Sequence, residues 1–117
     1  MFSEIINAKL NVCLEHIDTI FKYTHNIKSA DEFVLSRGGL TFDGTLMRLQ
    51  ALTETIKKIS SVHPEVIEQL NYPELSDLIK FRDYVSHHYE MMAHEVVFSI
   101  VKHDLPKLRD AISRLLS

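Results

Sequence analysis

Hydrophobic positions recur every three or four residues through most of the chain, which is the period of an amphipathic helix. The first such segment runs from about Ser3 to Asn26, and we expect Ser3 to be its N-cap. Its buried seam should consist of Ile6, Leu10, Cys13, Ile17, Ile20 and Thr24. This stepping by four and three is typical of a helix in a bundle.

The second and third helices are separated by a glycine pair. A short helical turn is expected from Asp31 to Leu35, with Asp31 as its cap, and Gly38 and Gly39 then favour a loop. The next long helix is expected from about Asp43 to Val62. Its apolar face should contain Leu46, Leu49, Leu52, Thr53, Ile56, Ile59 and Ser60.

Two prolines divide the second half of the chain. The long helix should end at His63, because the residue before a proline avoids helical geometry, and Pro64 suits the first turn of a short helix, PEVIEQL. Another break is expected at residues 71–73, and a further helix from about Glu74 to Met91.

The last segment, from about Ala93 to Leu116, has one apolar face and an internal proline. The face consists of Val97, Val101, Leu105, Leu108, Ile112 and Leu115. Pro106 should kink or split this helix, and Asp104 is a candidate cap for the second part. No segment alternates with a period of two. We therefore expect a single all-α domain over residues 1–117, an up-and-down bundle of four or five helices.

Composition narrows the classes of protein without identifying one. The chain has 117 residues, 45% of them apolar, and a formal net charge of −3, which argues against a large basic face for nucleic acid. No run of about 18 apolar residues is present, so no membrane span is expected. The single cysteine, Cys13, lies on an apolar seam and is expected to be a buried small hydrophobe. A cysteine that cannot form an internal disulfide and a first segment unlike a signal peptide predict a cytoplasmic protein.

The stretch FRDYVSHHYE concentrates titratable side chains on one predicted helix. Arg82 and Tyr89 are seven residues apart and fall on the apolar seam, where a buried charge needs a partner or a function. Asp83 and His87 are four apart, so the carboxylate can hold the imidazole. Arg82 and His87 lie roughly 140° apart around an ideal helix. Either the helix distorts near Ser86, or two chains pair as a symmetric dimer.

Other interpretations of these side chains remain open. Arg82 can pair with a carboxylate of another helix, and Tyr89 can be a core residue with its hydroxyl at the rim. His87, Glu90 and His94 share one face if the helix continues, which is a pattern suited to zinc. The break expected near residue 92 would interrupt that face, and no fourth ligand is evident, so no metal is predicted.

The spacing Arg82-x4-His87-x-Tyr89 resembles the R-x4-H-x-Y motif of HEPN-domain proteins. The chain is most similar to the HepT-like toxins that are paired with minimal nucleotidyltransferases. The order of helices and the segments LTETIKK and EVVFSIVKHDLPKL are similar to that family as well. The chain departs from the family at Asp83, where Asn is frequent. An aspartate adds negative charge near a bound phosphate.

The resemblance implies an RNA-cleaving toxin of a toxin–antitoxin pair, acting as a homodimer without a metal or another cofactor. The resemblance further implies that His87 is the general acid or base at the ribose 2′-hydroxyl, that Arg82 stabilises the phosphate and that Asp83 orients His87. The products expected are a 2′,3′-cyclic phosphate and a 5′-hydroxyl. Tyr89 resembles the tyrosine that the nucleotidyltransferase antitoxin modifies with AMP. The alternative is a binding or antitoxin-like module that associates with a nucleotidyltransferase and does not cleave RNA.

Overall fold

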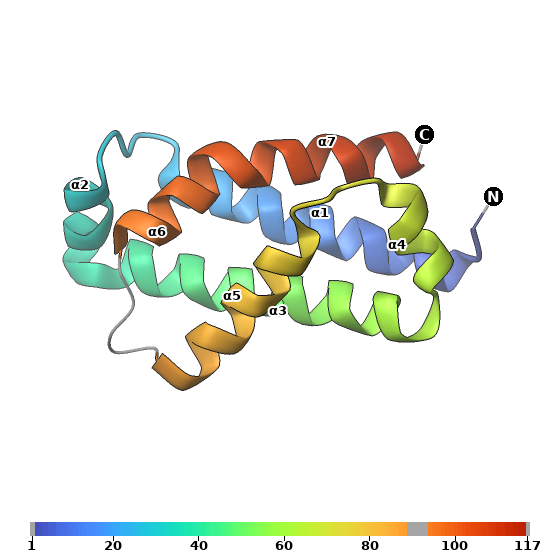
Figure 1. Cartoon of the computed structure of the whole chain (residues 1–117). Helices are drawn as coiled ribbons and strands as arrows, with labels where there is room; N and C mark the ends of the chain where they lie inside the picture. Colours follow the sequence, from blue (N-terminus) through green and yellow to red (C-terminus); the bar gives the residue numbers. More distant parts are fainter. Residues whose placement is uncertain (1, 89–93, 117) are drawn as a thin grey trace.

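Helices account for every regular element in the described part of the chain. The computed structural model describes residues 2–88 and 94–116, and for Arg82 and residues 85–88 it describes the backbone alone. The elements are α1 (Glu4–Thr24), α2 (Ala30–Leu35), η1 (Ser36–Gly39), α3 (Leu40–Val62), α4 (Pro64–Leu70), α5 (Leu75–His88), α6 (His94–Ser99), η3 (Ile100–Asp104) and α7 (Leu105–Leu116). Helices α1, α3, α5 and α7 alternate in direction (Figure 1), which confirms the predicted up-and-down bundle.

The first helix follows its sequence pattern residue by residue. Ser3 is the N-cap, and its hydroxyl oxygen accepts a hydrogen bond of 3.2 Å from the backbone N–H of Ile6. All six predicted seam residues are buried. Thr24 is the last of the six, and its hydroxyl donates to the carbonyl oxygen of Ile20 over 2.9 Å. The polar end of the seam is therefore satisfied within the helix itself.

The structure corrects two predictions around the glycine pair. Ser29, not Asp31, caps α2, because its hydroxyl accepts the N–H of Glu32 over 3.1 Å and Asp31 lies inside the first turn. The next helix begins at Leu40 rather than near Asp43. The chain reverses within the short turn η1, so the helix can restart immediately after it.

The last segment bends without breaking into two helices. The backbone N–H of Leu105 donates to the carbonyl oxygen of Ile100, five residues back, which makes η3 a π-helical turn. Pro106 has no N–H, and its ring would crowd the preceding turn of an α-helix. The wider π turn lies directly before Pro106, at the position of that crowding. Of the two outcomes predicted for Pro106, a kink or a split, the structure shows the kink. Asp104 lies inside η3, so its predicted role as the cap of a separate helix is wrong.

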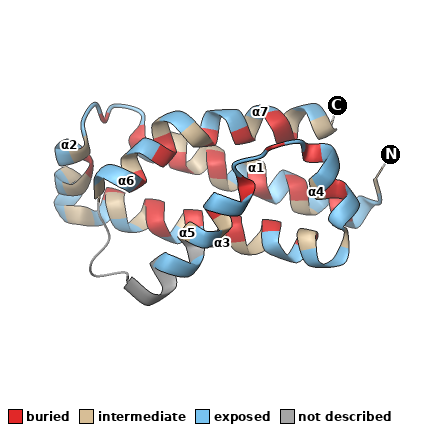
Figure 2. Cartoon of the chain, viewed as in Figure 1, coloured by how far each residue is buried: buried red, intermediate tan, exposed pale blue. Residues whose placement is uncertain are grey.

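The core forms where the apolar faces of the long helices meet (Figure 2). Helix α1 packs against α3 and α7, while α5 packs against α3. Phe33 of α2 is completely buried against Phe42 and Phe98, with ring centroids 5.3 and 5.6 Å away. At the surface, Arg109 of α7 donates two hydrogen bonds of 2.7 and 3.3 Å to the carboxylate of Asp18 in α1. None of the described helices is of a length and apolarity that would cross a membrane.

Candidate functional site

Helix α5 presents the candidate motif on the side of the bundle formed by α3 and α5 (Figure 1). Its first turns are fixed by Leu75 and Leu78, whose exposed fractions are 6% and 5%. Asn71 adopts a left-handed conformation that ends α4, and the N–H of Leu75 donates to the carbonyl oxygen of Tyr72. The chain is thereby redirected so that α5 begins with its apolar face on the core.

The motif residues are spread around this helix. Arg82 and His87 both belong to α5, which is helical without interruption from Leu75 to His88. The distortion considered near Ser86 is therefore absent from the backbone, and the two positions point about 140° apart. The side chains of Arg82 and His87 are not described, and Tyr89 lies outside the described residues.

Asp83 connects the motif helix to α3. One of its carboxylate oxygens lies 3.9 Å from the ammonium nitrogen of Lys57, and both side chains are about half exposed. The sequence predicted a partnership of Asp83 with His87, which stays a prediction because the imidazole is not described. Lys57 was not among the predicted site residues. Its only signal in the sequence was the basic pair at the end of LTETIKK.

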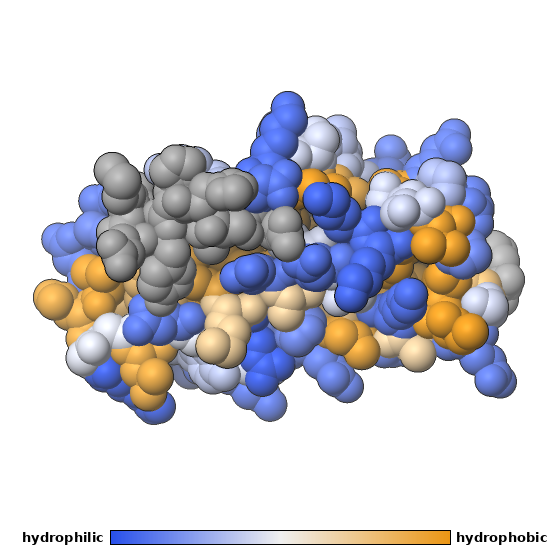
Figure 3. Space-filling model, turned by 90° about the horizontal axis from the view of Figure 1, so that it is seen from below, coloured by the Kyte–Doolittle hydropathy of each residue, from blue (hydrophilic) through white to orange (hydrophobic). Residues whose placement is uncertain are grey.

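The two flanks of α5 differ in charge. On the flank that faces α6 and η3, a hollow of about 320 Å³ is lined by Tyr72, Glu74, Asp77, Leu78, Phe81, Val96, Ile100 and Asp104. Three of these side chains are carboxylates, so this flank repels phosphate. The opposite flank adjoins Lys57 of α3. Figure 3 shows the face formed by the lower helices of Figure 1, with polar surface across its middle and apolar surface towards both ends.

Tyr72 shows the electrostatic character of the acidic flank. Its hydroxyl donates to the carbonyl oxygen of Asp104 over 3.3 Å. Burial, together with the nearby negative charges of Asp104 and Glu74, raises the pKa of Tyr72 to about 12. Tyr72 therefore remains a protonated donor at neutral pH and acts as a fixed structural contact.

The histidine pattern that suits zinc is only partly described. His94 lies at the start of α6, and its Nε2 is 3.4 Å from an Asp31 oxygen and 3.3 Å from a Glu95 oxygen. This contact joins α6 to α2. Glu90 is outside the described residues, as is the end of the expected helix at Met91. Among the residues that are described, no three His, Cys, Asp or Glu side chains are grouped as metal ligands.

Cys13 is a core residue, as the sequence predicted. Its side chain is fully buried, and burial raises the pKa of the thiol to about 12. A thiolate is the nucleophilic form of cysteine, so this side chain has no nucleophilic role at neutral pH.

The fold and the motif together define an all-α domain with an arginine and a histidine on one helix of the bundle. The family model described as "Ribonuclease HepT-like" matches residues 13–115. The chain therefore belongs to the HepT-like ribonuclease family.

One curated relative extends this result. A Methanocaldococcus jannaschii protein named "Gamma-glutamylcyclotransferase and putative RNase" is 28% identical over 111 residues. The alignment covers 95% of this chain and 47% of the relative, so the chain spans about half the length of that protein. No solved structure matches the chain significantly.

Proposed function

We propose that this protein is a metal-independent RNA endonuclease that acts as the toxin of a toxin–antitoxin pair. The observation that supports this most strongly is the family match over residues 13–115, within which Arg82 and His87 stand at the motif spacing on one continuous helix. The relative that carries an RNase designation in its name points to the same chemistry.

In the proposed reaction, His87 removes the proton of a ribose 2′-hydroxyl. The 2′-oxygen forms a bond to phosphorus, and the bond from phosphorus to the 5′-oxygen of the next nucleotide breaks. That oxygen takes up a proton, which leaves a 2′,3′-cyclic phosphate and a 5′-hydroxyl. Arg82 stabilises the negative charge that develops on the phosphoryl oxygens. Asp83 orients His87 from one turn earlier on α5.

The continuity of α5 supports a homodimer as the active form. Two positions about 140° apart on a straight helix reach one phosphate poorly from a single chain. A twofold axis beside α5 would place Arg82 of one protomer near His87 of its partner. The cleft between the two protomers would also concentrate cations, Lys57 included, on an otherwise acidic protein.

Cleavage of RNA by the purified protein tests the proposal directly. Incubation with tRNA in EDTA should give products that end in 2′,3′-cyclic phosphate. His87→Ala should lower the rate about a hundredfold or more, as expected when a general acid or base is removed. Equal cleavage by wild type and His87→Ala would reject the proposed role of His87 and point to a contaminating nuclease.

Neutralisation by a partner nucleotidyltransferase forms the second part of the proposal. The hydroxyl of Tyr89 would attack the α-phosphorus of ATP, forming an O–P bond and releasing pyrophosphate. The bulky anion so added, two residues from His87, would block the cleft by charge and volume. Mass spectrometry after co-expression should show a gain of one AMP on Tyr89 and none in Tyr89→Phe.

A non-catalytic role is the second candidate, and the observation that favours it is the position of Asp83. Its carboxylate faces Lys57 at 3.9 Å and neutralises part of the charge available to a phosphate. In this alternative the bundle binds a nucleotidyltransferase or a nucleotide without cleaving RNA. Growth arrest when the chain is expressed alone supports the toxin, whereas normal growth with a stable complex supports the binding module.

A further inference from the structure

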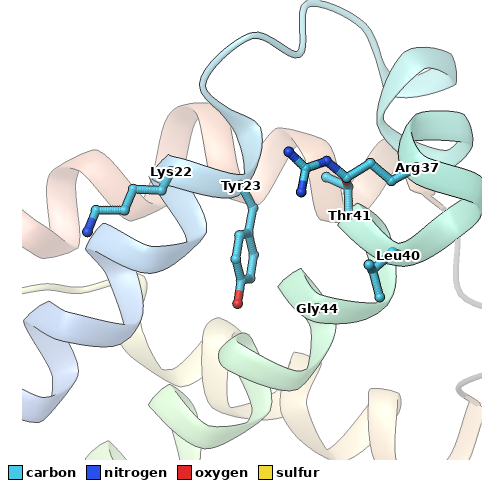
Figure 4. A pocket seen from close by; sticks show the side chains of 6 residues that line it. All are labelled: Lys22, Tyr23, Arg37, Leu40, Thr41 and Gly44. Atoms are coloured by element: carbon cyan, nitrogen blue, oxygen red, sulfur yellow. The ribbon is translucent and has the colours of Figure 1, made fainter.

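A second hollow lies away from α5, where the end of α1 meets η1 and the start of α3. Its volume is about 270 Å³. The residues that line it are Lys22, Tyr23, Arg37, Leu40, Thr41 and Gly44. Figure 4 shows Tyr23 in the middle of the hollow, Lys22 on one side and Arg37 on the other. None of these residues belongs to the R-x4-H-x-Y motif, and no role follows for them from the proposed function.

Two cations border this hollow without a carboxylate partner in the described structure. Lys22 and Arg37 are exposed, and neither forms an ion pair with a residue whose side chain is described. Lys22 comes from the last turn of α1 and Arg37 from η1, so the fold places both charges at the edge of the same hollow. Such a pair attracts an anionic group such as phosphate.

The backbone at Arg37 is held in a conformation that disfavours its side chain. Its φ of 52° is left-handed, and Gly38 and Gly39 follow with positive φ values of 64° and 96°. Glycine adopts this left-handed geometry more readily than arginine, so the backbone conformation does not explain why an arginine stands here. A strained residue beside a hollow is a feature of ligand-binding sites. Here the strained turn directs the guanidinium towards Tyr23, as Figure 4 shows.

Gly44 forms a wall of the hollow and leaves room for the aromatic ring of Tyr23. It lies inside α3, where glycine is unfavourable compared with alanine. A Cβ at this position would lie 3.2 Å from Cε2 of Tyr23, so the absent side chain makes room for the ring. Tyr23 keeps 41% of its surface exposed, which leaves part of its side chain available to a ligand.

We propose that this hollow binds one nucleotide of a single-stranded RNA, with its base against Tyr23 and its two flanking phosphates near Lys22 and Arg37. An aromatic ring beside two cations is the combination by which proteins hold single strands. The volume is close to the lower limit of about 300 Å³ for ligand pockets, which suits one nucleotide. The proposal rests on the proposed function in one respect. If the α5 site cleaves RNA, the hollow gives that RNA a second point of attachment.

Two variants remove the site without unfolding the chain. Arg37→Gly deletes a cation at a left-handed position that glycine adopts freely. Gly44→Ala favours the helix and crowds Tyr23. Neither should lower the melting temperature appreciably. Lys107→Ala, an exposed lysine of α7, is the matched control for loss of a positive charge.

Fluorescence anisotropy with a labelled single-stranded oligoribonucleotide tests the proposal. All variants are made in a His87→Ala chain, so binding is measured without cleavage and does not depend on whether the protein is a nuclease. Arg37→Gly and Gly44→Ala should each weaken binding about fivefold or more. Fivefold is the lower end of the effect expected when one base stack is lost. Lys107→Ala should leave the affinity unchanged, and a duplex of the same sequence should bind more weakly than the single strand.

The same measurements can overturn the proposal. Unchanged affinity in Arg37→Gly and Gly44→Ala would do so, as would an equal loss in Lys107→Ala, which would indicate diffuse attraction to charge. A titration with AMP, followed by NMR of the Gly44 amide, separates the sources of the nucleotide. Binding of AMP with unchanged oligonucleotide affinity in the variants would assign the hollow to a free nucleotide and reject RNA. Cleavage of tRNA by wild type tests the α5 site independently.

Discussion

At the scale of single residues, Lys57 and Asp83 form a pair that matters for its position beside the motif helix more than for stability. Both side chains are about half exposed and their charged atoms are 3.9 Å apart, so the pair stabilises the fold by little. It does, however, place an ammonium group of α3 beside the motif helix. Lys57 is therefore placed to contact a phosphate that approaches α5 from this flank.

We therefore expect Lys57→Ala to weaken RNA binding while leaving the fold intact. The loss of one phosphate contact should lower the slope of log K against log salt concentration by about 0.7 for a single strand. The free energy of unfolding should change by less than about 0.5 kcal/mol, as for an ordinary surface substitution. Anisotropy titrations between 50 and 200 mM salt and urea denaturation provide the two measurements.

Lys58→Ala is the matched control for this prediction. Lys58 is adjacent on α3 but borders a hollow with Ala8 and Val12 of α1, on a different side of the helix. The same change in salt slope for both lysines would contradict a specific contact at Lys57.

We expect His16 to make the stability of the bundle depend on pH. Its Nδ1 is 3.2 Å from Nη1 of Arg48, and burial together with that positive charge lowers the pKa of His16 below 6.5. The unfolded chain therefore binds a proton at a pH where the folded chain does not. Neutral His16 makes its full contribution to stability above pH 6.5, the ordinary pKa of histidine. This contribution is lost as the pH falls towards the lower pKa of His16 in the folded state.

Urea denaturation at pH 7.5 and pH 5.5 checks this expectation. Wild type should lose more stability between the two values than His16→Gln, which keeps a polar side chain beside Arg48 without titrating. An identical loss in both proteins would show that other groups cause the dependence.

At the scale of helices, periodicity predicted interiors better than ends. The six seam residues of α1 are all buried because a 21-residue helix repeats its signal over several turns. Ends depend on a few backbone bonds: Ser29 and Asp31 are both good caps, and only the hydrogen bond to Glu32 distinguishes them. The start of α3 was missed because Leu40 is exposed and extends no apolar seam.

The candidate site was predictable only where it lies on one helix. The spacing of Arg82 and His87 is visible in the sequence, because neighbours on a helix follow from residue number. The approach of Lys57 to Asp83 depends on how α3 packs against α5, which no local spacing encodes. The hollow around Tyr23 likewise combines the end of α1 with η1 and the start of α3, which α2 separates from α1 in the sequence.

Among the described side chains of α5, Leu75 and Leu78 are buried in the core. Leu78 is 5% exposed and forms part of the core. Leu78→Ala should therefore reduce the free energy of unfolding by about 2–5 kcal/mol, because the removed atoms leave a cavity. Denaturation monitored by circular dichroism measures the loss. Ser76→Ala, at an exposed position of the same helix, is the control and should have little effect.

At the scale of the whole molecule, the proposed dimer predicts that two inactive variants restore each other. In a mixed dimer of Arg82→Ala and His87→Ala, one of the two shared clefts contains an intact arginine and an intact histidine. After subunits exchange at random, activity should return to about a quarter of the wild-type value, because half of the dimers are mixed and each has one intact cleft. The measurement is tRNA cleavage before and after the variants are mixed.

The double variant and the state of association complete this test. The double variant Arg82→Ala/His87→Ala is the control. When it is mixed with either single variant, the mixed dimers contain no intact cleft and the mixture should stay inactive. Recovery in that mixture, or a monomer by light scattering at micromolar concentration, would refute a cleft shared by two protomers.

The buried thiol of Cys13 has a practical consequence for distance measurements. Because its pKa is raised to about 12 and the side chain is inaccessible, a spin label that reacts with thiolates will leave it unmodified in the folded protein. Ser76→Cys would then introduce the one labelled position on α5 without any need to replace the native cysteine. In a symmetric dimer the two labels form a single pair, and pulsed electron paramagnetic resonance can measure how far apart the two α5 helices lie in solution.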